Sequence, residues 1–486
     1  MLRKFFKEAA IYGIADFIAK FITFASFPWY TRALTVEQFG VFALVITLGA
    51  LLALFFNCGL NNAVQRVYLD PKTEKNECPV IVTTGLFCLL GFSLIVCLLF
   101  LTLGYPYRHI LLEQHQISWN MVLIGLLSTI LLQLNVYCLD VLRVNFQPWK
   151  FTSLTLIQNI TTVVSSLIFV IGFGWGVIGY LGGLSLGYAL TLPFSLWLIR
   201  SNLTWQFEFK LAKELVKFGY PFIFAGLAFW LYGSMDRWML AELSTNTQVG
   251  LYSLAFKLAT VLIFLNTTFA TAWSPFAFKS HRNDPNYKEH FSTLFVLWWY
   301  ALIFAATALS LFSPEILFIL TPPDYWPAAM IVPYIAFGLA LTGAGQVVGI
   351  GISLKNRTVH FTYASWITAF INLTMNYFFI PVWGAEGAAI ATLFSNGVLF
   401  FYYYLISQKL HPLPLNLKKV AFCGIMTLIP LYFSYYFLRQ PVSHALIFSK
   451  LTVLAVMAIV GFALNINSVE KLFGLLRSKQ KAESIG

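Results

Sequence analysis

Charged side chains are scarce in this chain of 486 residues. Asp, Glu, Lys and Arg together make up 10% of it, whereas hydrophobic residues make up 59% and the mean hydropathy is +0.76. A soluble domain carries about 25% charged residues. The composition therefore excludes a soluble globular protein and indicates an integral membrane protein.

Residues that bind metals or perform covalent catalysis are also scarce. The six cysteines include no Cys-x-x-Cys pair, and the seven histidines show no ligand spacing. The sequence contains no Walker loop, His-Glu-x-x-His motif, nucleophile elbow or dinucleotide fingerprint. We therefore expect no metal and no cofactor, and we expect any active transport to draw on an ion gradient or on substrate flux. The net charge of +12 does not indicate nucleic acid, because the basic residues are dispersed among loops.

Long apolar stretches dominate the sequence. A bilayer-spanning helix takes about 20 apolar residues, and runs such as 80–103 are apolar on every side, unlike barrel strands. The predicted fold is therefore an all-α integral membrane protein with about 14 transmembrane helices. The predicted spans are residues 9–30, 39–60, 79–103, 118–140, 151–173, 177–199, 218–240, 250–272, 291–312, 328–353, 359–381, 385–407, 418–437 and 445–464.

The basic residues predict the orientation of these spans. If the N-terminus is cytoplasmic, 24 of the 31 Lys and Arg residues fall on the cytoplasmic side and three fall on the outer side. Such an excess is typical of cytoplasmic loops. Both termini are therefore predicted to be cytoplasmic. The longest connections have about 18 residues, which is too few for a folded domain outside the membrane.

Two short motifs occur twice at nearly equal offsets. The motif Trp-Gly-x-x-Gly begins at Trp175 and again at Trp383, 208 residues later, and the glycine pair Gly40 and Gly250 is separated by 210 residues. Repeats of this kind are typical of secondary transporters, whose substrate site lies between the halves.

The repeats predict two pseudo-symmetric six-helix lobes related by an axis along the membrane normal. The predicted domains are an N-terminal lobe at 1–205, a C-terminal lobe at 206–410, two appended helices within 411–464, and a basic cytoplasmic tail at 465–486.

Ionisable residues inside spans are costly and are the candidate site residues. Asp16 and Lys20 are four residues apart in the first span and share a helix face. One interpretation is a self-neutralising pair that reaches toward the headgroups. The other is a central cavity that faces a charged substrate or a coupling ion.

Four further residues complete the candidate set. Asp236 and Arg237 lie near the outer end of the seventh span, and Arg32 lies at the outer end of the first, where an interfacial anchor is the simpler interpretation. Lys257 lies about two turns into the eighth span with no acid near it on that helix, which favours a position facing the cavity. Lys450, in the last span, is interpreted as a snorkelling anchor.

Three segments resemble signatures of one transporter family. They are residues 28–42, with Thr31-Arg32-Ala33-Leu34 and Phe39-Gly40; Gly219-Tyr220-Pro221 followed by Asp236-Arg237 and Val249-Gly250; and Trp383-Gly384-Ala385-Glu386-Gly387. The family is that of the polysaccharide flippases for O-antigen or capsule repeat units. It belongs to the multidrug/oligosaccharidyl-lipid/polysaccharide exporter superfamily.

The resemblance implies two six-helix lobes around a V-shaped cavity with a cation-lined lumen. The implied substrate is an undecaprenyl-diphosphate-linked oligosaccharide, such as a lipopolysaccharide repeat unit, which crosses from the cytoplasmic to the periplasmic leaflet by alternating access. The implied location is the bacterial inner membrane, and the implied partners are membrane lipid, a polysaccharide polymerase and a chain-length regulator. The first helix has no arginine cluster, which argues against a peptidoglycan-precursor flippase.

Other functions stay open at this point. A multidrug exporter of the same fold takes cationic drugs and needs acids in its cavity, whereas the embedded charges here include Lys20, Arg237 and Lys257. A membrane polymerase or ligase is expected to carry catalytic groups on sizeable outer loops, and the predicted outer loops are short. A scaffold leaves the repeat and the embedded charges unexplained. The sequence therefore favours a transporter over an enzyme.

Overall fold

The computed structural model describes residues 13, 15, 17–415, 446–461 and 463. Within these residues the regular elements are helices, and no strand occurs. The chain divides into two compact units, Met1–Gly250 and Leu251–Gly486, and the division falls inside one helix. The prediction of an all-α membrane fold is confirmed. The lobe boundaries at residues 205 and 410 stay predictions.

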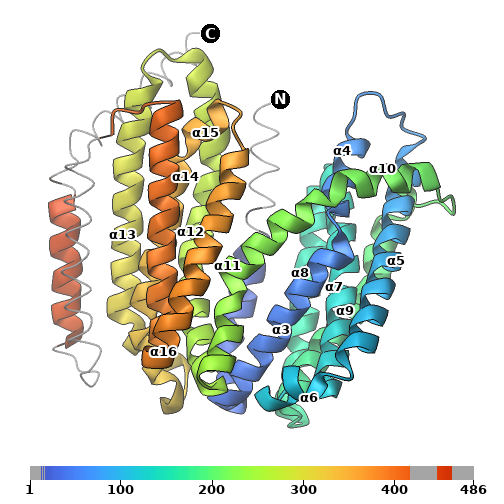
Figure 1. The fold of residues 1–486 in the computed structure, drawn as a ribbon, viewed down its shortest axis with the longest axis horizontal. Helices are drawn as coiled ribbons and strands as arrows, with labels where there is room; N and C mark the ends of the chain where they lie inside the picture. Colours follow the sequence, from blue (N-terminus) through green and yellow to red (C-terminus); the bar gives the residue numbers. More distant parts are fainter. Residues whose placement is uncertain (1–12, 14, 16, 416–445, 462, 464–486) are drawn as a thin grey trace. The chain divides into compact units, whose positions relative to one another are not determined.

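The first unit begins with helical residues 17–25 and continues through the blue-to-green helices of Figure 1. These are α2 (Phe27–Ala33), α3 (Val36–Asn57), α4 (Leu60–Tyr68), α5 (Cys78–Gly104), α6 (Arg108–Leu111), α7 (Trp119–Val144), α8 (Pro148–Leu167), α9 (Gly176–Leu198), α10 (Phe209–Gly219) and α11 (Pro221–Leu243).

The second unit takes most of α12, whose first turn belongs to the first unit. Its helices are α12 (Asn246–Asn283), α13 (Tyr287–Leu320), α14 (Val332–Val348), α15 (Ile350–Leu354), α16 (Val359–Leu410) and the helix Leu446–Gly461. Aromatic rings fill its core, where Phe269 stacks on Trp298 with centroids 3.9 Å apart.

Ten helices of the described residues are long and apolar enough to cross a bilayer. The sequence predicts fourteen spans. Part of the difference lies in α16, a 52-residue element that combines the predicted spans 359–381 and 385–407 across a break at Gly384. The predicted span 9–30 lies partly, and 418–437 wholly, outside the described residues, so the count of fourteen stays a prediction.

The two copies of Trp-Gly-x-x-Gly have the same local structure. The first glycine is left-handed in both, with φ of +55° at Gly176 and +54° at Gly384, a conformation that favours glycine because it has no Cβ. The tryptophan before it packs on a phenylalanine of the preceding helix, with ring centroids 5.2 Å apart in Phe169–Trp175 and in Phe379–Trp383. The repeat is therefore present in the structure of each unit.

The second glycine of each copy allows two helices to approach closely. A Cβ on Gly179 would lie 2.8 Å from the carbonyl oxygen of Phe169, and a Cβ on Gly387 would overlap the carbonyl oxygen of Phe379. Small residues at such contacts are typical of packed membrane helices. Each motif thus turns the chain and packs the following helix against the preceding one.

The other repeated pair forms a reciprocal contact inside the first unit. A Cβ on Gly40 would overlap the carbonyl oxygen of Asn246, and a Cβ on Gly250 would overlap the carbonyl oxygen of Val36. The first turns of α3 and α12 therefore touch backbone to backbone. A capping box fixes the start of α3, because the Thr35 side chain accepts from the Gln38 amide.

Replacing Gly387 by alanine is expected to destabilise the protein. The new methyl group meets backbone, so α16 must shift at a cost of about 1–3 kcal/mol. The matched control is Gly397→Ala in the same helix, where a Cβ has open space and alanine is the better helix former. Thermal unfolding of the purified proteins in detergent checks this. Equal unfolding temperatures for the two variants would contradict it.

Candidate functional site

Helix α11 buries two opposite charges in an apolar span. Asp236 is 1% exposed and Arg237 is 8% exposed. The Arg237 guanidinium donates a hydrogen bond to the carbonyl of Gly233 at 3.0 Å. Charged groups in a hydrocarbon environment are costly and are by default functional. The predicted site residues Asp236 and Arg237 are therefore buried charges in an apolar helix and remain candidates for a functional role.

Three contacts attach α11 to α3. The indole N–H of Trp230 donates to the carbonyl of Thr47 at 2.8 Å, and the indole N–H of Trp238 donates to the Thr47 hydroxyl at 3.0 Å. One turn before Trp230, a Cβ on Gly226 would lie 2.8 Å from Leu54. These contacts recur every four or eight residues, which is the spacing of one helix face. Packing on α3 therefore fixes the rotation of α11 and with it the positions of the charged pair.

The other candidates lie in different surroundings. Lys20 is exposed on helical residues 17–25, and Arg32 is exposed in the last turn of α2. Lys257 is half-buried in α12 and belongs to the second unit. Asp16 lies outside the described residues. The single cavity shared by these residues stays a prediction.

Buried amides inside each unit connect helices. In the first unit, Asn135 of α7 is fully buried, donates to the carbonyl of Tyr188 in α9 at 3.1 Å, and accepts from Ser195 at 2.6 Å. In the second unit, Asn266 of α12 donates to the carbonyl of Leu339 in α14 at 2.8 Å. These amides therefore join helices into rigid units.

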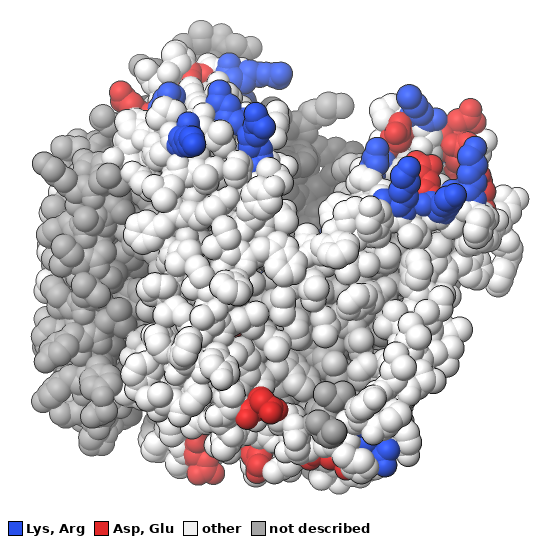
Figure 2. All heavy atoms as spheres, viewed as in Figure 1, with Lys and Arg blue, Asp and Glu red and all other residues white. Residues whose placement is uncertain are grey.

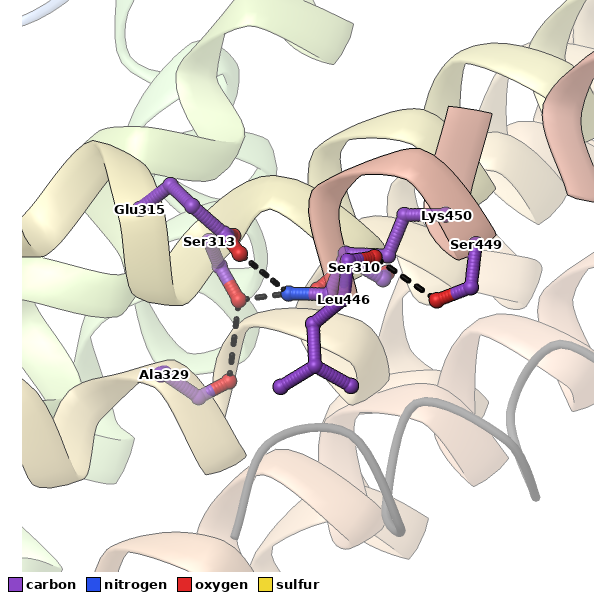
Figure 3. A network of polar contacts seen from close by, with 7 residues as sticks. All are labelled: Ser310, Ser313, Glu315, Ala329, Leu446, Ser449 and Lys450. Atoms are coloured by element: carbon purple, nitrogen blue, oxygen red, sulfur yellow. Dashed lines mark hydrogen bonds and ion pairs between the residues drawn. The ribbon is translucent and has the colours of Figure 1, made fainter. Parts of the chain in front are cut away.

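The position of Lys450 corrects the sequence interpretation. It is 1% exposed and does not snorkel: its ammonium group lies 2.6 Å from a carboxylate oxygen of Glu315 near the end of α13. Figure 3 shows the pair reaching across from the two helices. The physical reason is that an opposite charge inside the protein compensates a lysine that would otherwise extend to water. Glu315 was missed because the predicted span ends at residue 312.

The neighbours of this ion pair are polar and come from the same end of α13. The Ser313 hydroxyl donates to the carbonyl of Ser310 at 2.9 Å and lies 3.4 Å from the carbonyl of Ala329 (Figure 3). A second contact joins the same two helices, because the Tyr300 hydroxyl of α13 donates to the carbonyl of Met457. The helix Leu446–Gly461 is thus held on α13 at two points.

Removing one partner of the ion pair is expected to destabilise the protein strongly. Lys450→Ala leaves the Glu315 carboxylate buried without its counterion, at a cost of about 3–5 kcal/mol. The exchange Lys450→Glu with Glu315→Lys restores opposite charges and is expected to recover most of the loss. The measurement is thermal unfolding in detergent, with the exposed Lys213→Ala as control. An unfolding temperature for Lys450→Ala equal to that of the control would refute the role.

Groups able to hold a metal do not gather in the part of the chain that the structure describes. No three His, Cys, Asp or Glu side chains there form a set of potential ligands. The five described cysteines are free thiols, and Cys58, Cys97 and Cys138 are buried. The described site chemistry is therefore that of fixed charges, amides and aromatic rings.

The architecture is that of a multi-pass membrane transporter. The solved structure described as the inward closed conformation of the lipid II flippase MurJ superposes with a TM-score of 0.74 at 18% identity, over 94% of this chain and 100% of that one. An inward-facing multidrug resistance MATE transporter of the MOP superfamily superposes with a TM-score of 0.69 at 13% identity, over 80% of this chain and 94% of that one. At these identities the likeness establishes the fold.

Sequence comparison establishes the family. The family described as "Polysaccharide biosynthesis protein" matches residues 5–281, which is more than half of the chain, and this protein belongs to it. The Haloferax volcanii protein described as "Probable low-salt glycan biosynthesis flippase Agl15" is 22% identical over 424 residues, covering 86% of each chain. The resemblance to a polysaccharide family, drawn from the sequence, is confirmed.

Proposed function

We propose that this protein is a flippase for a lipid-linked oligosaccharide. The substrate that we propose is an undecaprenyl-diphosphate-linked repeat unit, such as an O-antigen unit of lipopolysaccharide. It moves from the cytoplasmic to the periplasmic leaflet of a bacterial inner membrane by alternating access, coupled to a gradient of H+ or Na+. Membership of the polysaccharide biosynthesis family supports the substrate class, and the transporter fold supports the mode of action.

The observation that carries the proposal is the buried guanidinium of Arg237 in an apolar span. A guanidinium carries five N–H donors in a planar fork, and two parallel donors match the oxygens of a phosphate group. In a medium of low dielectric constant its attraction for an anion is much stronger than in water. A diphosphate headgroup is the part of the proposed substrate that such a cation would attract. Lys20 and Lys257 are the other basic residues that we propose to bind substrate.

The distribution of surface charge supports the proposed orientation. Figure 2 shows most of the visible Lys and Arg side chains gathered at one end of each unit. In the first unit these residues belong to segments 66–75 and 200–217, and in the second to 279–288 and 355–357. Cytoplasmic loops are the ones that carry such an excess. We therefore propose that these ends, and both chain termini, lie in the cytoplasm.

A second candidate function rests on Asp236. Its carboxylate is 1% exposed, and a buried acid in a transporter of this fold would attract an organic cation. The structural likeness to a multidrug MATE transporter agrees with that function as far as the fold goes. An antiporter of cationic drugs is thus the alternative, with Asp236 rather than Arg237 as the group that contacts substrate.

Substitutions of Arg237 test the proposal directly. Arg237→Ala is expected to lower flipping by more than tenfold, and Arg237→Lys is expected to stay well below wild type because an ammonium group cannot bind phosphate in a bidentate manner. Lys20→Ala and Lys257→Ala are expected to cause smaller losses. The measurement follows labelled undecaprenyl-diphosphate-linked repeat units by leaflet in proteoliposomes.

Two controls accompany this test. Lys213→Ala removes an exposed cation from α10 and is expected to flip like wild type, and membrane insertion of every variant is checked by its yield. Full flipping by the alanine variants of Lys20, Arg237 and Lys257 would rule out their contact with the diphosphate.

Deleting the gene distinguishes the candidate functions in the cell. A flippase deletion is expected to remove surface polysaccharide and to strand complete repeat units in the cytoplasmic leaflet. Normal polymer with increased drug sensitivity would favour the antiporter. Repeat units that reach the periplasmic leaflet but stay unpolymerised would indicate a polymerase instead.

A further inference from the structure

Four chain segments meet at one end of the second unit and carry most of the Lys and Arg residues that the structure describes in that unit. They are the end of α12, the start of α13, the turn after α15, and the residues that follow α16. Within residues 279–290, 355–357 and 409–411 there are six Lys and Arg residues against two acids, with three histidines. Figure 2 shows this gathering of Lys and Arg on the surface.

Three rings form the base of this cluster. The Tyr287 ring of α13 stacks on His411, with centroids 5.7 Å apart and planes inclined by 19°. His281 of α12 meets both rings edge-on, at 4.8 Å from Tyr287 and 5.5 Å from His411. The Tyr287 hydroxyl and Nε2 of His411 are 2.9 Å apart. The rings therefore hold the ends of three helices in a fixed arrangement.

The segment that carries His411 is fastened on both sides. The side-chain amide of Gln408 donates to the carbonyl of Leu413 at 3.1 Å, and its oxygen accepts from the Leu413 amide at 3.0 Å. The Ser292 hydroxyl of α13 donates to the carbonyl of Pro414 at 2.7 Å. His411 itself is 6% exposed. The site thus sits on rigid elements, as a binding site requires.

The positive charge of the cluster is poorly compensated. Burial, followed by the charges of Lys288, His281 and Lys355, lowers the pKa of His411 to about 4. One of the two acids is already engaged, because Asp284 binds the ring of His290 at 2.8 Å and the amide of Asn286 at 2.8 Å. The electrostatic potential at the cluster is therefore positive and attracts an anion.

We propose that His281, Lys288 and Lys355, arranged around the Tyr287–His411 pair, form a binding site for a phosphate group. Two ammonium groups and an exposed imidazole supply donors for an oxyanion that accepts several hydrogen bonds. The phosphate belongs either to the headgroup of a membrane phospholipid or to a free phosphate or diphosphate. This site is separate from the buried charges of α11, and its test needs no transport.

The test uses the full-length protein in detergent and inorganic pyrophosphate as the probe. Pyrophosphate is expected to raise the unfolding temperature of wild type in a saturable way, compared with chloride at equal ionic strength. Lys288→Gln with Lys355→Gln is expected to weaken this binding about tenfold, since each exposed charge pair contributes up to about fivefold. Lys288→Arg with Lys355→Arg is expected to keep it.

The matched control is Lys72→Gln with Lys75→Gln. It removes two loop lysines of the first unit from a segment that also holds Asp70, Glu74 and Glu77, and it is expected to bind pyrophosphate like wild type. The proposal is overturned if wild type responds to pyrophosphate no more than to chloride. It is also overturned if both glutamine pairs weaken binding equally.

Nanodiscs then separate the two sources of phosphate. If phosphatidylglycerol nanodiscs abolish the response to pyrophosphate and phosphatidylcholine nanodiscs preserve it, the site binds an anionic phospholipid headgroup. A response preserved in both lipids assigns the site to a free phosphate or diphosphate. Neither result depends on substrate movement. The phosphate-site proposal and the flippase proposal can therefore fail independently of each other.

Discussion

The hydrocarbon interior of a bilayer offers no hydrogen-bond partners, and this constraint shapes every part of the structure. Backbone groups in such a medium must pair within their own segment, which is why the described residues form helices. Polar side chains follow the same rule. The fully buried Asn135 pairs with the carbonyl of Tyr188, and Thr342 of α14 donates to the Asn396 side chain of α16 at 2.9 Å. Hydrogen bonds between buried polar groups therefore help to hold the helices of each unit together.

Close backbone contact is the second consequence. Apolar side chains gain little from leaving lipid for protein, so helices in a membrane associate by tight packing. Glycines supply it here at repeated positions. Gly179 and Gly387 each pack against the carbonyl of a preceding phenylalanine. Gly40 and Gly250 form a reciprocal contact, in which each packs against a carbonyl of the other helix. That the same motif performs the same packing in both units is the strongest structural sign of duplication in the chain.

Much of the fold could be predicted from the sequence, because a helix that spans a bilayer must consist largely of apolar residues. The cores of the predicted spans 79–103, 118–140 and 177–199 lie within α5, α7 and α9. Helix breaks were predicted unevenly. The predicted spans 359–381 and 385–407 leave a gap at Gly384, where the structure breaks α16, whereas the left-handed Cys58–Gly59 step ends α3 inside the predicted span 39–60. The break at Cys58–Gly59 depends on a tertiary contact, because Gly59 lies against Gly219. A hydropathy pattern does not show such contacts.

The surroundings of the embedded charges were predicted less completely than the fold, because the partners of a charge come from distant segments. The position of Asp236 and Arg237 inside an apolar helix could be predicted, because two charges in an apolar span are visible in the sequence. Glu315 was not found, since it stands only five residues from the end of α13, and its partner Lys450 is 135 residues away.

Lys450 and Arg237 look alike in sequence, as single basic residues in apolar helices, yet the structure places them in different surroundings. The charge of Lys450 is neutralised by Glu315 of another helix, so the pair attaches one helix to the other. Arg237 lies next to Asp236 on α11 and donates to the carbonyl of Gly233 one turn earlier in the same helix. Both helices are apolar, so only the tertiary structure distinguishes a lysine that joins two helices from an arginine that is bonded to its own helix.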